Sequence, residues 1–450
     1  MRITRQVAPL ALVASALTGL VACAPDSGPG PDSAAPFEEP GLALDRAPAG
    51  QALPFTPIPT SASCVAGGLA EQVILPVGYL PSLVAIEGPA SPDLPDMMTV
   101  NETGHRSGRY LYRAHETGSN SAVTVTDLET GVTSILAQRA DWERFDGISW
   151  TPWGTIVVAE EVTTSAIKDP ALPAAVGGHV YEIDPAPGAA PLLPAGRPRA
   201  HEGPRFDRDG NLAGISETGP GYIYRFVPTR RGDLSSGKLY ALRIVEDAGD
   251  RTGWAEWVLL DGPASEINSI AEAAAKGATG YSRPEDVEIG TSTGNDRRGN
   301  NILYVAMTGE NRVIAIDLKA GGRSGKAYVS DYVRNGVNAP TDFTSPDNLA
   351  LDNSGNLYIT EDPGGTAGSG KTQGDDVWFA PYNPASARTA LPAERFLTVT
   401  DCDAEPTGIY LSPSNKTLFV NIQHRGGSDP RDMTLAIRKY SSTNFLRAVE

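Results

Sequence analysis

The sequence predicts an all-β fold, a β-propeller of about six blades that follows a signal peptide and a Pro-rich linker and carries a short helical insertion. Two observations favour this class. Short apolar segments recur along the chain, and turn residues separate them. They return every ~50 to 90 residues with hairpins between them, as the blades of a propeller do. A β-sandwich, or several separate β domains, is the alternative that this pattern leaves open.

The repeated unit is a turn with Asp, Asn or Gly, then a short apolar strand, then an acidic or polar residue. It occurs at residues 151–161, 207–217, 300–310, 352–362 and 412–421. One segment breaks the pattern. Residues 265–276 begin with a capping serine, Ser265, and are followed by Gly277, which predicts a helix inserted between blades.

The composition is that of a globular protein. The chain has 450 residues, of which 40% are hydrophobic and 20% charged, enough to bury a large core. Its formal net charge is -17. A field of this sign repels phosphate backbones, and the chain has no local basic patch, so we expect no nucleic-acid partner. The charge either gathers cations or serves the solubility of an exported protein.

Residues 1–22 have the features of a secretory signal. Two arginines precede an apolar run at residues 7–20, which is too short to span a bilayer as a mature helix. The run ends in Leu-Val-Ala before Cys23 and resembles the lipobox of bacterial lipoproteins. We therefore expect export and a lipid anchor on Cys23 that holds the protein at the cell envelope, on its periplasmic or outer face. An ordinary signal peptide with an incidental cysteine is the alternative.

Residues 23–60 are rich in Pro, Gly, Ser and Ala, which predicts a flexible tether with polyproline character. The folded propeller is expected at residues 61–450. It contains two further cysteines, Cys64 and Cys402. In an oxidising compartment these two could pair and close a long loop between the ends of the folded region. Reduced, buried cysteines are the alternative.

Three familiar catalytic motifs are absent or out of context. The chain has no Gly-x-Ser-x-Gly elbow and no His-Glu-x-x-His helix. Residues 365–372 have the spacing of a phosphate-binding P-loop, but a glycine, an aromatic strand and a proline follow instead of a helix. We interpret this segment as a surface loop.

Carboxylates recur where predicted strands end. They are Glu116, Glu160, Glu161, Glu202, Glu217, Glu285, Glu288, Asp347, Glu361, Asp362 and Glu405. In a propeller the ends of the innermost strands converge on one axial funnel, where several carboxylates repel one another unless cations neutralise them. Oxygen ligands suit calcium or iron better than zinc. Acids that cap turns and face solvent are the alternative.

Five motifs occur in the order in which they are found in PhoX-type alkaline phosphatases, and the chain resembles that family from about residue 100 to about residue 430. They are residues 146–155 with Glu160-Glu161, His201-Glu202-Gly203, Ser282-Arg283-Pro284-Glu285, Ser345-Pro346-Asp347-Asn348 and residues 417–424. The resemblance implies a propeller whose axial funnel holds calcium ions and a pair of ferric ions. It also implies hydrolysis of phosphate monoesters outside the cytoplasm.

The resemblance implies roles for individual residues. Arg283 resembles the arginine that steadies the phosphate, a role that suits its bidentate fork, and Glu202 is the second catalytic candidate. The metal-ligand candidates are Glu116, Glu160, Glu161, Glu202, Glu285, Asp347 and Glu405. At Ala159 the family ordinarily has a cysteine that binds iron, so calcium is the expected cofactor and iron is in doubt.

Two functions follow from these predictions. The first is an exported, metal-dependent phosphoesterase that acts on a small phosphorylated substrate. The second is a non-catalytic or lactonase-like propeller that calcium stabilises and that binds a ligand or partner.

Overall fold

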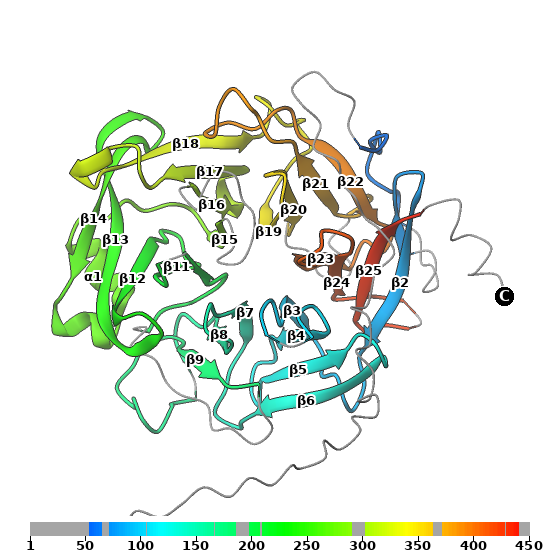
Figure 1. The fold of residues 1–450 in the computed structure, drawn as a ribbon, viewed down its shortest axis with the longest axis horizontal. Coiled ribbons are helices and arrows are strands. Elements are labelled where there is room, and N and C mark those ends of the chain that lie inside the picture. Colours follow the sequence, from blue (N-terminus) through cyan, green and yellow to red (C-terminus); the bar gives the residue numbers. More distant parts are fainter. Residues whose placement is uncertain are drawn as a thin grey trace, which may run out of the picture. The chain divides into compact units, whose positions relative to one another are not determined.

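The computed structural model describes residues 54–64, 72–104, 106–165, 167–185, 198–207, 209–289, 302–362, 371–427 and 429–440. The predicted signal peptide, Cys23, most of the tether and most of the P-loop-like segment lie outside these ranges. The described residues belong to one compact unit within residues 39–450. Its sheets surround a central axis (Figure 1), so the predicted all-β propeller class is confirmed.

The strands of the described residues form five antiparallel sheets. The first contains β3 (Pro95–Val100), β4 (Tyr110–His115), β5 (Ala122–Asp127) and β6 (Val132–Gln138). The second contains β7 (Phe145–Trp150), β8 (Ile156–Glu160) and β9 (Val180–Ile183). In both sheets the first strand lies nearest the axis and later strands lie progressively outward (Figure 1).

The third sheet has nine strands and joins two blade-like runs. One run contains β10 (Arg205–Phe206), β11 (Leu212–Ile215), β12 (Ile223–Arg230), β13 (Asp233–Gly249) and β14 (Thr252–Leu260). The other contains β15 (Pro284–Ile289), β16 (Ile302–Met307), β17 (Arg312–Asp317) and β18 (Ala327–Arg334). The outer strands β14 and β18 pair with each other. The number of blades depends on how this sheet is divided, and the count of about six stays a prediction.

The last two sheets include strands from the start of the described chain. One contains β19 (Pro346–Leu351), β20 (Leu357–Glu361), β21 (Asp376–Ala380), β22 (Glu394–Val399) and β1 (Val73–Ile74). The other contains β23 (Glu405–Leu411), β24 (Leu418–Gln423), β25 (Met433–Lys439) and β2 (Tyr79–Ile86). The pairing of β2 with β25 closes the ring between early and late segments of the chain.

Covalent and aromatic contacts reinforce this closure. Cys64 and Cys402 form a disulfide with a Cα–Cα distance of 5.3 Å, which ties the segment before β1 to the connection between β22 and β23. Phe55 is buried, and its ring lies edge-on to Phe379 and Phe396 at centroid distances of 5.3 and 5.1 Å. Packed structure therefore starts before residue 60, inside the segment predicted as a tether.

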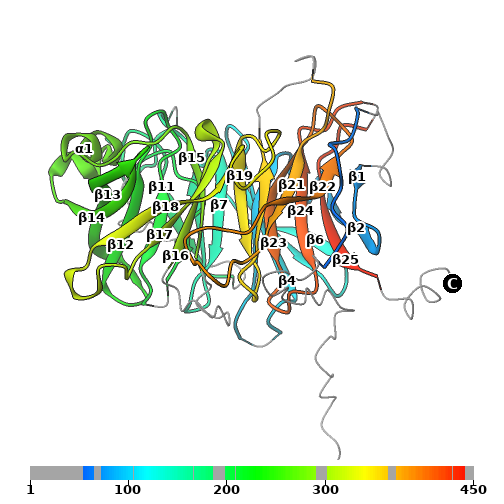
Figure 2. The same cartoon turned by 90° about the horizontal axis from the view of Figure 1, so that it is seen from above.

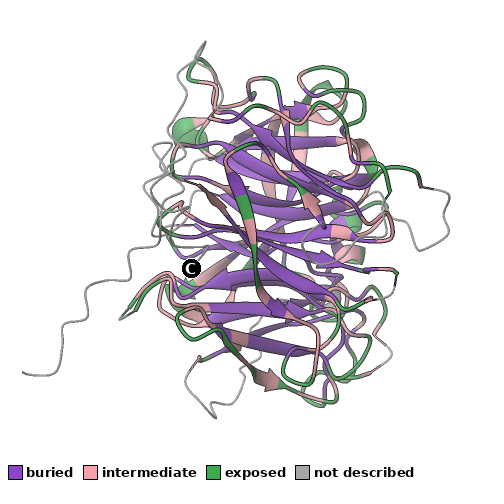
Figure 3. Cartoon of the chain, turned by 90° about the vertical axis from the view of Figure 1, so that its right-hand side faces the viewer, coloured by how far each residue is buried: buried purple, intermediate pink, exposed green. Residues whose placement is uncertain are grey.

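The core lies between neighbouring sheets. Every residue of β7 and β15 is buried, because both faces of an innermost strand are covered by adjacent sheets. Most of the strand ribbon is buried, and exposed residues lie mainly in the connecting loops (Figure 3). In a view turned by 90°, these strands run roughly along the axis (Figure 2). Successive side chains of one strand point to opposite sides, so each strand supplies apolar groups to two interfaces.

The helical insertion is shorter than predicted. A 3-10 helix spans Pro263–Glu266, and α1 spans Ser269–Ala275, with Gly277 at φ +71° beyond its end. Asn268 caps α1, because its side chain accepts a backbone N–H of the first turn; the prediction that Ser265 is the cap is wrong. Within the described part of the chain, no helix is long and apolar enough to span a membrane.

Candidate metal centre

Four innermost strands, β3, β7, β15 and β19, begin with the same local geometry. A residue other than glycine with a left-handed backbone comes directly before each strand: Leu94, Arg144, Arg283 and Ser345, at φ 52°, 42°, 43° and 45°. The acid two positions later is Asp96, Asp146, Glu285 or Asp347. A register shift follows in every one of these strands. Such backbone strain costs on the order of 1 kcal/mol or more, and its repetition marks a functional site.

In two of these sheets, the last residue of the second strand accepts a hydrogen bond from the backbone of this turn. In β8, Glu160 accepts the backbone N–H of Glu143 at 2.9 Å, and in β20, Glu361 accepts the N–H of Thr344 at 2.7 Å. Glu143 and Thr344 each precede a left-handed residue. Glu160, a predicted metal ligand, is thus not among the residues that line the cavity, whereas the adjacent Glu161 is. Consecutive side chains of a strand face opposite sides, which separates these two acids.

The turns open into an axial cavity of about 780 Å³. Fourteen acids line it: Glu87, Asp93, Asp96, Glu116, Asp146, Glu161, Glu202, Glu217, Glu285, Asp347, Asp362, Asp403, Glu405 and Asp432. The basic side chains among the described lining residues are Arg144, Arg283, His424 and Arg425. We call this space the acidic cavity. Its excess of negative charge predicts that it attracts cations.

Six of the seven predicted ligands lie at the acidic cavity, and sequence reasoning left out others. Besides the central trio described below, the cavity contains the predicted Glu116, Glu161 and Glu405. It also contains Asp96 and Asp146, which were not predicted. A Pro-acid pair precedes the register shift at residues 95–96, 284–285 and 346–347, and this repeat is the sequence signal that could have found Asp96.

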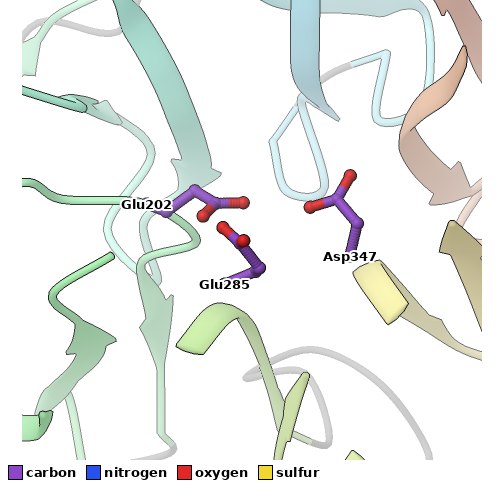
Figure 4. A group of neighbouring side chains, drawn as sticks. All are labelled: Glu202, Glu285 and Asp347. Carbon is purple, nitrogen blue, oxygen red and sulfur yellow. The ribbon is translucent and has the colours of Figure 1, made fainter. Parts of the chain in front are cut away.

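At the centre of the acidic cavity, Glu202, Glu285 and Asp347 bring one carboxylate oxygen each within 4.8 Å of the others. Their carboxylates point toward a common space (Figure 4). All three residues are buried, and Oε2 of Glu202 has no hydrogen-bond partner among the described residues. Oδ1 of Asp146 lacks a partner in the same sense. A buried carboxylate oxygen without a hydrogen-bond donor is unfavourable unless a cation binds it. These oxygens are therefore candidate cation ligands.

The electrostatics of these acids are unfavourable without cations. Burial, followed by repulsion from Glu285, raises the pKa of Glu202 and of Asp347 well above the ordinary value. Burial, with repulsion from Glu116, raises the pKa of Asp96 to about 8, and burial raises that of Glu285 to about 7. Near neutral pH these groups either hold protons or need positive charge nearby. The all-oxygen donor set fits hard cations such as calcium.

Asn348 positions two of the ligands. Its Nδ2 donates to Oε1 of Glu202 at 3.3 Å and lies 3.1 Å from Oδ1 of Asp347. Its Oδ1 lies 2.8 Å from Oγ1 of Thr407 and also accepts the backbone N–H of Gly408. Asn348 is fully buried, so it connects acids from separate sheets and holds them in one arrangement.

Glycines allow the ligand-bearing segments to approach one another at the axis. A Cβ on Gly203, next to Glu202, would overlap the Oδ1 atom of Asp286 in β15. A Cβ on Gly147, next to Asp146, would overlap Pro204 and the backbone of Glu202. Both positions therefore need glycine for close packing rather than for an unusual backbone angle.

Arg283 lies at the edge of the trio. Its Nε donates to Glu217 Oε1 at 2.7 Å, and its Nη2 lies 3.0 Å from Glu285 Oε1 and 3.6 Å from Asp362 Oδ2. Burial lowers the pKa of Arg283, but these carboxylates raise it by more, so the net shift of the pKa is upward. The side chain is nevertheless 43% exposed, so the guanidinium is held firmly and remains open to the cavity.

Ala159 lies away from the acidic cavity. It is fully buried in a hydrophobic cluster that includes Val157, Val180 and Phe206, and it is not among the cavity-lining residues. An alanine side chain offers no metal ligand in any case, and the doubt about iron stays a prediction. The choice of metal therefore depends on the acids themselves.

The fold and site define a class: a β-propeller with a carboxylate-lined axial cavity suited to hard cations. The family model for alkaline phosphatase PhoX matches residues 147–426, more than half of the chain. The chain therefore belongs to the PhoX alkaline phosphatase family, as the sequence motifs predicted. No curated protein matches it.

Several solved structures of low sequence identity are similar to this chain. PhoX of Pseudomonas fluorescens in complex with vanadate, a transition state analogue, is similar at a TM-score of 0.59 and 19% identity, over 84% of this chain and 98% of that chain. A gluconolactonase of Xanthomonas campestris has a TM-score of 0.47 and 12% identity, over 86% and 98%. Virginiamycin B lyase of Staphylococcus aureus has a TM-score of 0.42 and 11% identity, over 80% and 98%.

Proposed function

We propose that this protein is a metal-dependent phosphoesterase that hydrolyses phosphate esters in the acidic cavity. The observation that carries the proposal is the position of Arg283, an open guanidinium held directly beside the buried trio of Glu202, Glu285 and Asp347. A cavity this acidic repels a phosphate group by itself. An arginine beside a cation site would instead attract a phosphate group to this part of the cavity.

Different residues of the cavity have different roles in phosphoryl transfer. The fork of Arg283 suits two oxygens of the phosphoryl group, and its ion pairs with Glu217 and Glu285 fix its direction. Cations bound by the trio would supply charge stabilisation to the transferred group. In the reaction the oxygen of water bonds to phosphorus, the ester P–O bond breaks, and the alcohol leaves with a proton. Because such catalysis is mostly positioning and electrostatics, the hydrogen bonds from Asn348 that hold Glu202 and Asp347 in place would contribute to it.

Calcium is the metal that we propose for the cavity. Carboxylates are hard ligands, and calcium tolerates the irregular, high coordination that acids from several strands provide. We also propose that the protein is exported and anchored by lipid on Cys23. The support for this is the signal-like run at residues 7–20 and the lipobox-like sequence before the cysteine.

The test uses the purified full chain after metal stripping, with calcium added back. We expect release of phosphate from p-nitrophenyl phosphate with calcium and almost none with a chelator. Arg283→Ala and Glu202→Gln should each lower kcat/KM by about 100-fold or more. Arg230→Ala and Glu246→Gln change exposed residues that do not line the cavity, and they serve as matched controls. Calcium binding without turnover of any phosphate ester would contradict the proposal and favour the non-catalytic propeller.

A further inference from the structure

The rim of the acidic cavity has basic groups on two opposite sides. Contacts place β7 and β23 on either side of β3, and β11 and β19 on either side of β15. The strand β15 therefore lies across the axis from β3 (Figure 1). Arg283 precedes β15, whereas Arg144 precedes β7 and His424 follows β24. Arg144 and His424 thus flank the side of the cavity opposite Arg283.

These two side chains are only loosely paired. Nη1 of Arg144 lies 3.5 Å from Oε1 of Glu116, and Nε2 of His424 lies 3.8 Å from Oε1 of Glu405. Both distances exceed those of a good hydrogen bond. The side chains are 54% and 50% exposed, although both residues line the cavity. They therefore have donors available for a ligand in the cavity.

Both residues have a left-handed backbone, which at Arg144 belongs to the turn shared by four innermost strands. Arg144 has φ 42° and His424 has φ 56°, in the region that glycine adopts more easily. Neither residue is needed to fill the core. The remaining basic residue, Arg425, is buried and donates to Gln72 and to the backbone of Arg431, so it is already engaged.

We propose that Arg144 and His424 form a second anion-binding subsite, which binds a second phosphate group carried by the leaving-group part of the substrate. This inference depends on the proposed phosphoesterase function. A cavity of about 780 Å³ is far larger than one phosphoryl group needs and is in the range that holds a drug-sized ligand. An anionic leaving group in that space would meet mostly carboxylates, except on the side where Arg144 and His424 lie. A compact bisphosphate is the substrate class that would place one phosphate at Arg283 and the other at this subsite.

The experiment compares kcat/KM for glucose 1,6-bisphosphate and for glucose 6-phosphate, measured as phosphate release by the calcium-loaded full chain. We expect the ratio of the two constants to fall by about tenfold in Arg144→Gln and by less in His424→Gln, as for a lost hydrogen bond to a charged group. Arg144→Lys should restore part of the ratio. A ratio cancels any loss of metal that a variant causes for both substrates. Arg230→Gln, at an exposed position outside the cavity, is the matched control and should keep the wild-type ratio.

The outcomes separate this inference from the proposed function. Wild-type protein that hydrolyses both esters, with a ratio that Arg144→Gln and His424→Gln leave unchanged, would overturn the subsite and leave the phosphoesterase intact. Wild-type protein that releases phosphate from p-nitrophenyl phosphate but from neither glucose ester would also overturn the subsite alone, whereas no turnover of any of the three esters would overturn both proposals.

Discussion

Acids lie toward both ends of the innermost strands, but the two groups differ in how much positive charge lies beside them. At their N-terminal ends, in the acidic cavity, fourteen acids face few basic groups. Toward their C-terminal ends Arg205, Asp286 and Glu288 form a buried arginine cluster, in which Nε of Arg205 lies 3.3 Å from Glu288 and Nη2 lies 3.6 Å from Asp286. Backbone N–H groups also donate to both acids. Arg205 offsets part of this buried charge, although burial still raises the pKa of Asp286 to about 6 and that of Glu288 to about 7. The acids of the cavity have fewer cations beside them, and such unbalanced charge indicates a ligand.

The largest effect is expected from Arg205→Ala. The substitution leaves Asp286 and Glu288 buried without their cation and should lower the free energy of unfolding by about 3–5 kcal/mol. Denaturant titration of metal-stripped protein measures this. Arg230→Ala removes an exposed ion pair and should change stability by about 1 kcal/mol at most. Equal effects of the two substitutions would show that the cluster is not a structural charge pair.

Asn348→Ala tests the acidic cavity instead. It removes the donor shared by Glu202 and Asp347 and should weaken calcium binding by about 10- to 100-fold. Calorimetric titration with calcium gives the affinity. Asn353→Ala changes an exposed asparagine and is the matched control. Unchanged calcium affinity in Asn348→Ala would show that this side chain does not position the ligands.

The comparison also predicts a pH dependence. In metal-stripped protein the pKa of Asp96 is raised to about 8 and that of Glu285 to about 7, chiefly by burial. Between the ordinary and the raised values the folded state binds more protons than the unfolded state, so stability falls as pH rises through this window. We expect the Tm of stripped protein to fall by about 5 °C or more between pH 5 and pH 8. Calcium-loaded protein should change less, and a Tm of stripped protein that rises with pH would contradict this account.

The smallest effect is expected for Asp146→Asn, and the direction of its change in stability is informative. It removes one charge from the crowded cavity and should stabilise metal-stripped protein by about 1 kcal/mol, the scale of one pKa unit. The same change should weaken calcium binding. Glu246→Gln, at an exposed position outside the cavity, should do neither. Loss of stability in stripped Asp146→Asn would mean that the acids do not repel one another.

Much of the strand pattern could be predicted, because apolar strands bounded by turn residues are a local signal. The acids that follow second strands, such as Glu116 and Glu161, could be predicted for the same reason. Asp96 and Asp146 were missed because their direction depends on a left-handed residue and a register shift at the start of the strand. Glu160 was included among the ligands because local spacing does not show which of two adjacent acids faces the axis.

Long-range features were harder to predict. The pairing of β2 with β25 joins segments more than 340 residues apart, and no local pattern encodes it. The start of α1 was misplaced because Ser265 and Asn268 are both acceptable caps, and tertiary packing selects between them. The buried arginine cluster was not foreseen because Arg205 meets its acids only when the two blade-like runs of the third sheet come together.

The most direct test of the central claim is a calcium titration of the metal-stripped full chain, with Glu202→Gln/Asp347→Asn as the comparison. We predict saturable calcium binding to the wild-type protein, with an accompanying rise in Tm, and loss of the tightest binding in the double variant. Equal calcium binding by the two proteins would contradict the account, because the buried trio would then not be the site where cations are held.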